Sequence, residues 1–312
     1  MNPGLNDLVR AKLLDFSPQR LEPFLARLKE LVGDRCLALL AYGSCLSDAT
    51  RTQTSTPDFF VVVDSYGSFH RRRLHRILNR VLPPNIYHFA ISGRTAKYNV
   101  LSLRHLIRET SRHARDCYIL GRASKRLALL WTRDERVSDR IVAAQASALR
   151  TIDSKVVHLM PGTFGLEEFT KEALRFSYTA DVRVEAEDKI QRLFEAEREF
   201  YLAVHGSILE EMQGPPFLLT KGADGRYTKP PRGLWDFVGR ARTRWFLAVS
   251  RMKAQIRWPK GIFTVEGWVD YLLAKIERTQ GIKIEMTDRQ KKFWFIYGWK
   301  YFLMLRRKKL IK

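Results

Sequence analysis

Two short apolar runs separated by a polar loop constrain the fold of this chain more than any other feature. Cys36 to Tyr42 and Phe59 to Val63 are apolar and rich in β-branched or aromatic residues, which predicts two buried strands. Residues 43–57, rich in Ser and Thr, predict a loop between them. Further strands are predicted over 86–91 and 98–101, and helices over 17–33 and 71–82. The helix over 17–33 would have Ser17 as its N-cap, Pro18 at its first position and Gly33 as its end. The order of these elements indicates an α/β fold for the first part of the chain.

The character of the sequence changes after about residue 102. Helical patterns follow over residues 103–120, 136–158, 166–178 and 185–212. The stretch 214–233 is rich in Gly and Pro and predicts a linker, and the remainder is basic and aromatic. We therefore predict an α/β domain over 1–125, a helical domain over 126–233 and a basic C-terminal region over 234–312.

The net charge of +22 over 312 residues, with a pI near 10.2, predicts a polyanionic partner. Nucleic acid, an anionic membrane surface or a phosphorylated substrate would each fit. Three cysteines without CxxC spacing exclude a disulfide scaffold and a cysteine-built zinc site. No apolar run reaches the roughly 18 residues of a spanning helix, and the N-terminus lacks a signal-peptide pattern. We therefore expect a protein of a cytoplasm-like compartment.

Gly43-Ser44 and Asp58 form the sharpest chemical signal. A strand that ends in Gly-Ser can present backbone N–H groups and a hydroxyl to a triphosphate, because glycine lets a phosphate approach closely. A carboxylate at the start of the next strand can hold Mg²⁺ against that triphosphate. This order is similar to that of nucleotidyltransferases of the DNA polymerase beta superfamily. An ordinary turn followed by a capping Asp would give the same pattern.

A series of short motifs extends the signal along the chain. They are Tyr42-Gly43-Ser44, Asp58-Phe59, Val63-Asp64, Phe69-His70, Tyr87-His88, Lys97-Tyr98, Tyr118 with Gly121-Arg122 and Lys125, Ser177-Tyr178 with Asp181 and Arg183, and finally Glu187 and Lys189. In this order and spacing, the series resembles the mitochondrial-type phosphatidate cytidylyltransferases over about residues 40–190. Several positions depart from the family pattern, among them Cys45, Ser65, Asn99, Arg126 and Ala180. The departures indicate a divergent member of the family.

The resemblance implies a fold, an activity and a set of site residues. The fold would be a nucleotidyltransferase α/β domain of the DNA polymerase beta superfamily, a mostly helical, winged-helix-like domain and a C-terminal amphipathic basic segment. The activity would join CTP and phosphatidate to CDP-diacylglycerol with release of diphosphate, with Mg²⁺ as cofactor. Asp58, Lys125 and His70 would be catalytic. The substrate-binding residues would be Tyr42, Gly43, Ser44, Lys97, Arg122, Tyr178 and Arg183.

The second ligand of the metal would have to come from a segment distant from Asp58 in the chain. In a strand, Asp58 and Asp64 would lie about 20 Å apart, too far to share one ion. The usual second carboxylate of the superfamily, two residues after the first, would fall at Phe60 and is absent. Asp181 is therefore our candidate, although it could simply cap a helix. Lys125 and Arg122 could likewise belong to a solvated helix face.

The C-terminal region suits a membrane surface. Residues 289–312 contain nine Lys or Arg, no acid and seven interleaved aromatic residues. A helix over 293–305 would be about 20 Å long, too short to cross a bilayer core. It would lie on an anionic surface; nucleic-acid binding or a core helix are the alternatives for this region.

We expect a peripheral membrane enzyme on the cytoplasmic face of the inner membrane, or on the matrix face in a mitochondrion, with no nucleic-acid partner. Two other functions remain open. One is a nucleotidyltransferase that acts on RNA or another small acceptor. The other is an inactive lipid- or nucleic-acid-binding relative, which the residue at position 60 would favour.

Overall fold

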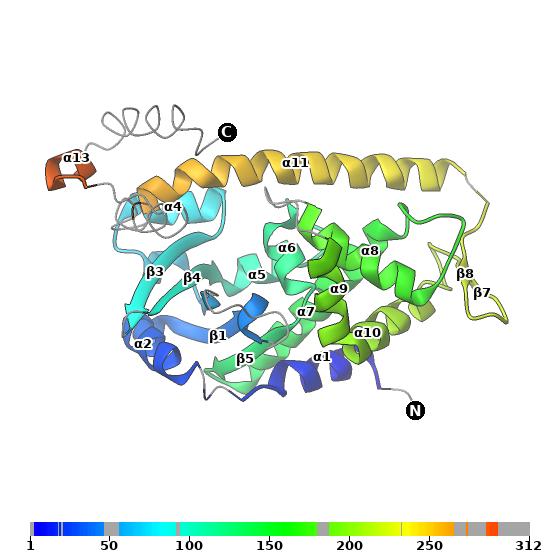
Figure 1. The fold of residues 1–312 in the computed structure, drawn as a ribbon, viewed down its shortest axis with the longest axis horizontal. Helices are drawn as coiled ribbons and strands as arrows, with labels where there is room; N and C mark the ends of the chain where they lie inside the picture. The colour runs from blue at the N-terminus through cyan, green and yellow to red at the C-terminus, as the bar shows by residue number, and fades with distance from the viewer. Residues whose placement is uncertain are drawn as a thin grey trace. The chain divides into compact units, whose positions relative to one another are not determined.

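The computed structural model describes residues 3–17, 19, 21–46, 56–91, 94–179, 187–231, 233–264, 273 and 285–292. The chain forms two compact units, residues 1–260 and 261–312. The second unit contains the end of α11 and the short helix α13 (Asp288–Lys292). All other elements lie in the first unit (Figure 1). The domain boundaries predicted near residues 125 and 233 remain predictions.

A five-stranded mixed sheet forms the centre of the α/β part. Its strands are β1 (Cys36–Tyr42), β2 (Asp58–Val63), β3 (Asn85–Ile91), β4 (Arg94–Ser102) and β5 (Leu127–Thr132). Their spatial order is β3-β4-β2-β1-β5, in which only β2 and β4 run parallel. The four predicted strands and the mixed α/β class are confirmed. The sequence analysis did not predict β5, which completes the sheet beside β1.

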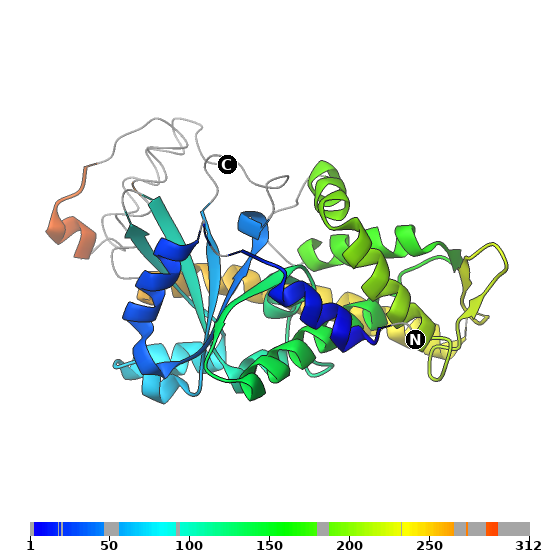
Figure 2. The same cartoon turned by 90° about the horizontal axis from the view of Figure 1, so that it is seen from below.

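Helices cover both faces of this sheet, and side chains that alternate along each strand enter two separate cores. Leu39 and Ala41 of β1 pack with α2 (Glu22–Val32) on one face. Leu40 and Tyr42 belong to the core on the other face. Figure 2 shows helices on both sides of the sheet. That second core takes in side chains of α1 (Leu5–Leu14), α5 (Leu103–Glu109), α6 (Cys117–Ala123) and α7 (Glu135–Val156).

The helix predicted over 17–33 begins later than expected. It starts at Glu22, with Leu21 at the N-cap and proline near its first position, so the prediction of Ser17 as the cap is wrong. Pro23 takes the place near the helix start that we assigned to Pro18, because proline fits the first turn of a helix equally well at either site. The predicted end is confirmed, since Gly33 is the C-cap residue with φ of 58°. The short 3-10 turn Gly33–Arg35 then leads into β1.

Two short helices follow β2. They are α3 (Tyr66–Phe69) and α4 (Arg73–Val81), and α4 confirms the helix predicted over 71–82. The helix predicted over 103–120 is in fact two helices, α5 and α6, because residues 110–116 form turns between them.

The later helices are α7, α8 (Leu166–Thr179), α9 (Glu187–Ala196) and α10 (Arg198–Glu211). Three two-residue strands accompany them: β6 (Thr163–Phe164), β7 (Thr220–Lys221) and β8 (Tyr227–Thr228), in the order β6-β8-β7. The stretch predicted as a linker therefore contains a small hairpin. Its Tyr227 is buried in the main core, so this stretch packs against the helices.

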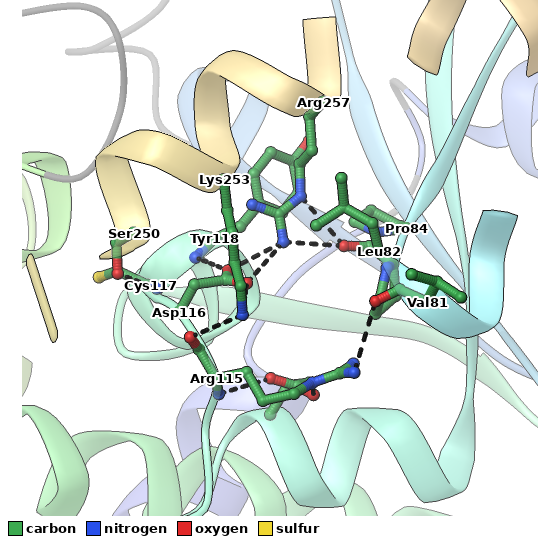
Figure 3. A network of polar contacts seen from close by, with 12 residues as sticks. Val81, Leu82, Pro84, Arg115, Asp116, Cys117, Tyr118, Ser250, Lys253 and Arg257 are labelled. Atoms are coloured by element: carbon green, nitrogen blue, oxygen red, sulfur yellow. Dashed lines mark hydrogen bonds and ion pairs between the residues drawn. The ribbon is translucent and has the colours of Figure 1, made fainter. Parts of the chain in front are cut away.

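The long helix α11 (Leu234–Thr264) is joined to the α/β part by polar contacts, which Figure 3 shows. Ser250 Oγ accepts a hydrogen bond of 3.0 Å from the N–H of Cys117. Arg257 reaches Asp116 and the carbonyl of Pro83, and Lys260 donates to the carbonyl of Pro84 at 2.7 Å. Among the described residues, no helix has both the length and the apolar character that crossing a membrane requires.

Candidate active site

One edge of the central sheet gathers the residues that the sequence assigns to nucleotide binding. β1 ends at Tyr42, which pairs with Asp58 at the start of β2 and with Leu127 at the start of β5. The turn Gly43–Leu46 follows β1 directly, and Lys125 precedes β5 by two residues. Antiparallel pairing of β1 with both neighbours therefore places the Gly-Ser turn, the carboxylate and the lysine at the same end of the sheet.

Asp58 and Lys97 project from the same face of the sheet. They are partners in the parallel β2–β4 pair, and Lys97 is in turn the partner of His88 across β3 and β4. Directly paired residues point to the same side of a sheet. Alternation along β2 makes this the face of Phe60, which belongs to the core shared with α6 and α7. The polar cluster thus opens toward the helical part of the molecule.

Gly43 gives the turn its shape. Its φ of +81° is in the region that side chains rarely adopt, and a Cβ at this position would lie 4.0 Å from Oδ2 of Asp58. The carboxylate therefore faces the backbone of the Gly-Ser turn, in which Ser44 is half-buried. Glycine at position 43 leaves room beside this carboxylate for a further group.

The buried side chain of Tyr42 lines this site. Its ring stacks on Phe60 with centroids 4.4 Å apart, and its hydroxyl accepts a hydrogen bond from Nδ2 of Asn99. Asn99 is itself 2% exposed and lies two residues after Lys97 on β4. Among the described residues, its Oδ1 has no hydrogen-bond partner.

The electrostatic surroundings of Tyr42 show which charged groups lie beside it. Burial raises the pKa of this phenol well above its usual range, and the negative charge of Asp58 and the phenol of Tyr118 raise it further. The guanidinium of Arg122 partly opposes these effects. Tyr42 is therefore neutral at physiological pH, and Asp58, Tyr118 and Arg122 are its neighbours.

Close packing of α6 against α8 brings the predicted site residues near these two helices together. A Cβ on Gly121 would lie only 2.6 Å from the carbonyl oxygen of Ser177, a contact that real Cβ atoms essentially never make. Only glycine therefore allows this approach. Tyr178, the next residue on α8, consequently lies beside Lys125, whose Nζ is 3.5 Å from the centroid of the tyrosine ring.

Three cations lie around two tyrosine rings near this edge. Lys189 Nζ, from α9, is 5.6 Å from the ring of Tyr178 that Lys125 also contacts. The guanidinium carbon of Arg122 is 3.8 Å from the ring centroid of Tyr118. Aromatic faces stabilise cations at such distances. Positive charge gathered in this way favours a ligand with several negative charges, such as a triphosphate.

His70, predicted to be catalytic, lies elsewhere. It is 5% exposed, and its Nε2 and Nδ1 are 2.9 Å from Asn79 Nδ2 and 3.2 Å from the Tyr87 hydroxyl. Asn79 also donates to the carbonyl of Val100, three residues beyond Lys97 on β4 and hence about 10 Å along the strands from the Asp58 end. The structure thus does not bring His70 to the edge that carries Asp58.

The remaining predicted positions divide into two groups. Tyr42, Gly43, Ser44, Lys97, Arg122, Lys125 and Tyr178 lie with Asp58 around the same end of the sheet. Asp181 and Arg183 lie outside the described residues.

The sequence analysis did not assign Asn99 or Lys189 to the site. Asn99 stood out only as a departure from the family pattern, because a buried amide gives no periodic signal. Lys189 closed the motif series without a site role, and its position 5.6 Å from the Tyr178 ring, which follows from the folding of α9, brings it to the site.

The acidic ligands for a metal are few. Within the part of the chain that the structure describes, no group of three or more His, Cys, Asp or Glu side chains could hold a metal ion. Magnesium, however, usually keeps several waters and binds through one or two carboxylates together with substrate phosphates. Asp58, with space beside it at Gly43, fits that role at the sheet edge.

Comparison with known proteins identifies one family. The family model described as "Phosphatidate cytidylyltransferase, mitochondrial" matches residues 82–229. The matched segment contains Lys97, Arg122, Lys125 and Tyr178, whereas Gly43, Ser44 and Asp58 precede it. No curated protein matches the chain.

Proposed function

We propose that the chain, whose residues 82–229 match the family of mitochondrial phosphatidate cytidylyltransferases, converts CTP and phosphatidate to CDP-diacylglycerol and diphosphate. The main support for the proposal is that residues inside the matched segment lie at the same sheet edge as residues of the earlier strands. Lys125, inside the matched segment, lies at the sheet edge formed by the Gly43 turn and Asp58, outside it. This shared position supports a single site formed by the nucleotide motifs and the family motifs.

We propose that the triphosphate of CTP lies along this edge. N–H groups of the turn after Gly43 and the hydroxyl of Ser44 would bind phosphate oxygens, since no Cβ obstructs the approach. Lys97, Lys125 and Arg122 would neutralise the remaining charge. The neutral hydroxyl of Tyr42, held by Asn99, would keep this edge in a fixed geometry.

In the reaction, an oxygen of the phosphatidate phosphate would attack the α-phosphorus of CTP. A new P–O–P bond forms as the bond to the β-phosphate oxygen breaks, and diphosphate leaves. Negative charge grows on the leaving group, so cations placed beside it stabilise the transition state more than the ground state. Lys125 is our candidate for this contribution, supported by its position at the sheet edge and its contact with Tyr178.

Asp58 would hold the magnesium ion, with Asp181 as the proposed second ligand. When bound, the ion would supply further charge neutralisation at the phosphates. The contribution of the chain is the position of the Asp58 carboxylate, fixed by the β1–β2 pairing against the Gly43 turn.

We also propose the finer classification of the fold. A sheet edge with Gly-Ser on one strand and Asp on the neighbouring strand supports membership of the DNA polymerase beta superfamily. The order α7–β6–α8–α9–α10–β7–β8, with β8 between β6 and β7, supports a winged-helix-like second part in which β7 and β8 form the wing.

We propose peripheral association with an anionic membrane through the region after residue 234. Several large apolar side chains of α11 face solvent, among them Phe237 (71% exposed) and Trp245 (73%). Between residues 234 and 264 the only acid is Asp236, whose carboxylate is paired with Lys229 and Arg240. The aromatic segment 293–305 lies outside the described residues. In this proposal the enzyme works on the cytoplasmic face of the inner membrane, or on the matrix face in a mitochondrion.

A transfer assay tests the function. The full chain is incubated with Mg²⁺, CTP labelled at the α-phosphate, and either vesicles that contain phosphatidate or RNA. We expect label in a lipid product, with release of diphosphate, and no label in RNA. Label in RNA, or no transfer to either acceptor by a folded chain that binds vesicles, would contradict the proposal.

A further inference from the structure

Helix α4 buries polar side chains and exposes apolar ones, the reverse of the usual arrangement in a surface helix. Its buried side chains are polar: His75 is 9% exposed and Asn79 is completely buried. Three of its apolar side chains face outward, since Leu74, Ile77 and Val81 are 52%, 59% and 67% exposed. These three positions, spaced i, i+3 and i+7, share one face of a helix. A surface helix normally turns such a stripe toward the core.

Buried hydrogen bonds hold α4 in this orientation. Asn79 Nδ2 donates to the carbonyl of Val100 at 3.1 Å, and its Oδ1 accepts from the N–H of Asn85 at 2.8 Å. Asn85 Nδ2 in turn donates to the carbonyl of His75 at 3.0 Å. Rotation of the helix about its axis would leave these buried groups without partners. His70, 2.9 Å from Asn79, belongs to the same polar core.

The surroundings of the exposed stripe are strongly basic. Five exposed arginines flank or share this helix: Arg71, Arg72, Arg73, Arg76 and Arg80. No acidic residue occurs between positions 65 and 84. The face therefore combines outward apolar side chains with a dense positive charge, the composition that suits an anionic lipid interface.

We propose that α4 is a docking surface for an anionic lipid bilayer, in addition to the basic region after residue 234, whose helix α11 contacts Pro83 and Pro84 just beyond α4. Leu74, Ile77 and Val81 enter the headgroup–acyl boundary, and the arginines bind lipid phosphates. A nine-residue helix is about 14 Å long, too small to supply the roughly 800 Å² per partner of a stable protein interface. A bilayer has no such requirement. The choice of lipid rests on the proposed function, whose acceptor is a membrane lipid.

A fluorophore on α4 tests the docking directly. Cys36 and Cys117 are buried, so the full chain with Cys45→Ser and Ile77→Cys takes an environment-sensitive label at position 77. The matched control carries the label at Leu14→Cys, where the native side chain is 57% exposed. We expect a blue shift and higher intensity at position 77 on adding vesicles of phosphatidylcholine with phosphatidylglycerol, and no change at position 14. Sedimentation of the labelled protein with vesicles, without a change in the fluorescence of the label at position 77, would overturn the proposal. A change that follows protein concentration without vesicles does so too, because it indicates a second copy of the chain.

A charge comparison supplies an independent measurement. Arg73→Gln with Arg80→Gln removes two positive charges from α4, and Arg136→Gln with Arg140→Gln removes two from exposed positions of α7. We expect the α4 pair to lower partition onto anionic vesicles by on the order of tenfold, and the α7 pair to leave it nearly unchanged. If the two pairs lowered partition equally, binding would depend only on the net charge of the protein, which would overturn the proposal. Neither measurement uses CTP, so vesicle docking without lipid product would contradict only the proposed reaction.

Discussion

Arg257 and Asp116, 141 residues apart in the chain, form a buried ion pair in which Nη2 of the arginine lies 2.9 and 2.8 Å from the two carboxylate oxygens. The same guanidinium carbon is 4.6 Å from the ring centroid of Tyr118. Asp116 caps α6 by accepting from the N–H of Tyr118 at 3.0 Å. α6 also carries Arg122, so this pair connects α11 to the helix that supports the candidate site.

Loss of Arg257 should destabilise the first unit. In Arg257→Ala the buried Asp116 loses its main partner, and we expect the free energy of unfolding to fall by about 3–5 kcal/mol. Urea denaturation measures this change. Arg251→Ala is the control, because Arg251 is exposed on the same helix, and its loss should cost under about 1 kcal/mol. Equal losses in the two variants would show that the ion pair does not hold α11 in place.

Asp58→Asn should abolish most activity without unfolding the protein. The amide keeps the size of the side chain but removes the charge that would hold the metal, so turnover should fall by on the order of a hundredfold or more. Asp64→Asn, at an exposed position just after β2, is the matched control and should retain activity. The lipid-transfer assay and circular dichroism check both variants. Near-full activity of folded Asp58→Asn would remove Asp58 from the site.

Lys125→Ala should cost about 2–4 kcal/mol of transition-state stabilisation, seen as a fall in kcat/KM. Lys125→Arg should recover only part of it, because a planar guanidinium differs in reach from an ammonium over the Tyr178 ring. Lys171→Ala, which removes a surface lysine paired with Glu167, should leave kcat/KM unchanged. An unchanged kcat/KM in Lys125→Ala would assign Lys125 to the solvated surface of the protein.

Acid should destabilise the fold through His70, which is buried, and His105, which is half-buried. Burial lowers the pKa of both His70 and His105 to about 4, and neighbouring positive groups add to the effect. Between pH 6.5 and pH 4 the unfolded chain binds protons that the folded chain does not, so stability falls as pH falls through this window. Each histidine can contribute up to about 3 kcal/mol to this loss. Urea denaturation at several pH values should show a smaller loss for His105→Gln and an unchanged loss for His113→Gln, an exposed loop position.

The apolar side chains on the outside of α11 should contribute to membrane binding. Phe237→Ser with Trp245→Ser should reduce sedimentation with vesicles that contain phosphatidylglycerol, because both side chains lose apolar area that the interface would bury. Binding of the parent protein should also weaken at 1 M salt, where the Debye length is about 3 Å. Leu14→Ser, at the exposed end of α1, is the control. Binding that neither substitution nor salt affects would exclude this face of α11.

The sequence by itself determined most of the elements and predicted the candidate site residues of the first strands. The apolar runs of β1 and β2, the glycine after α2 and the periodicity of α7 and α8 are local signals, because each depends on neighbouring residues. Gly43 and Asp58 were recognisable for the same reason, since the requirements of a phosphate-binding turn are expressed within a few residues. The sequence signal of β5 was ambiguous, because a six-residue apolar run between two helices can be a strand or part of a buried helix.

Only the tertiary structure decided which of these residues meet. Register across β1, β2 and β5 brought Lys125 to the Gly43 turn, and the contact of Gly121 with α8 brought Tyr178 to Lys125. The same packing placed His70 in a polar core under α4 and turned the apolar side chains of that helix outward. Such outcomes depend on pairings between segments far apart in the chain, whose hydrogen bonds outweigh the preference of a single helix to bury its apolar face.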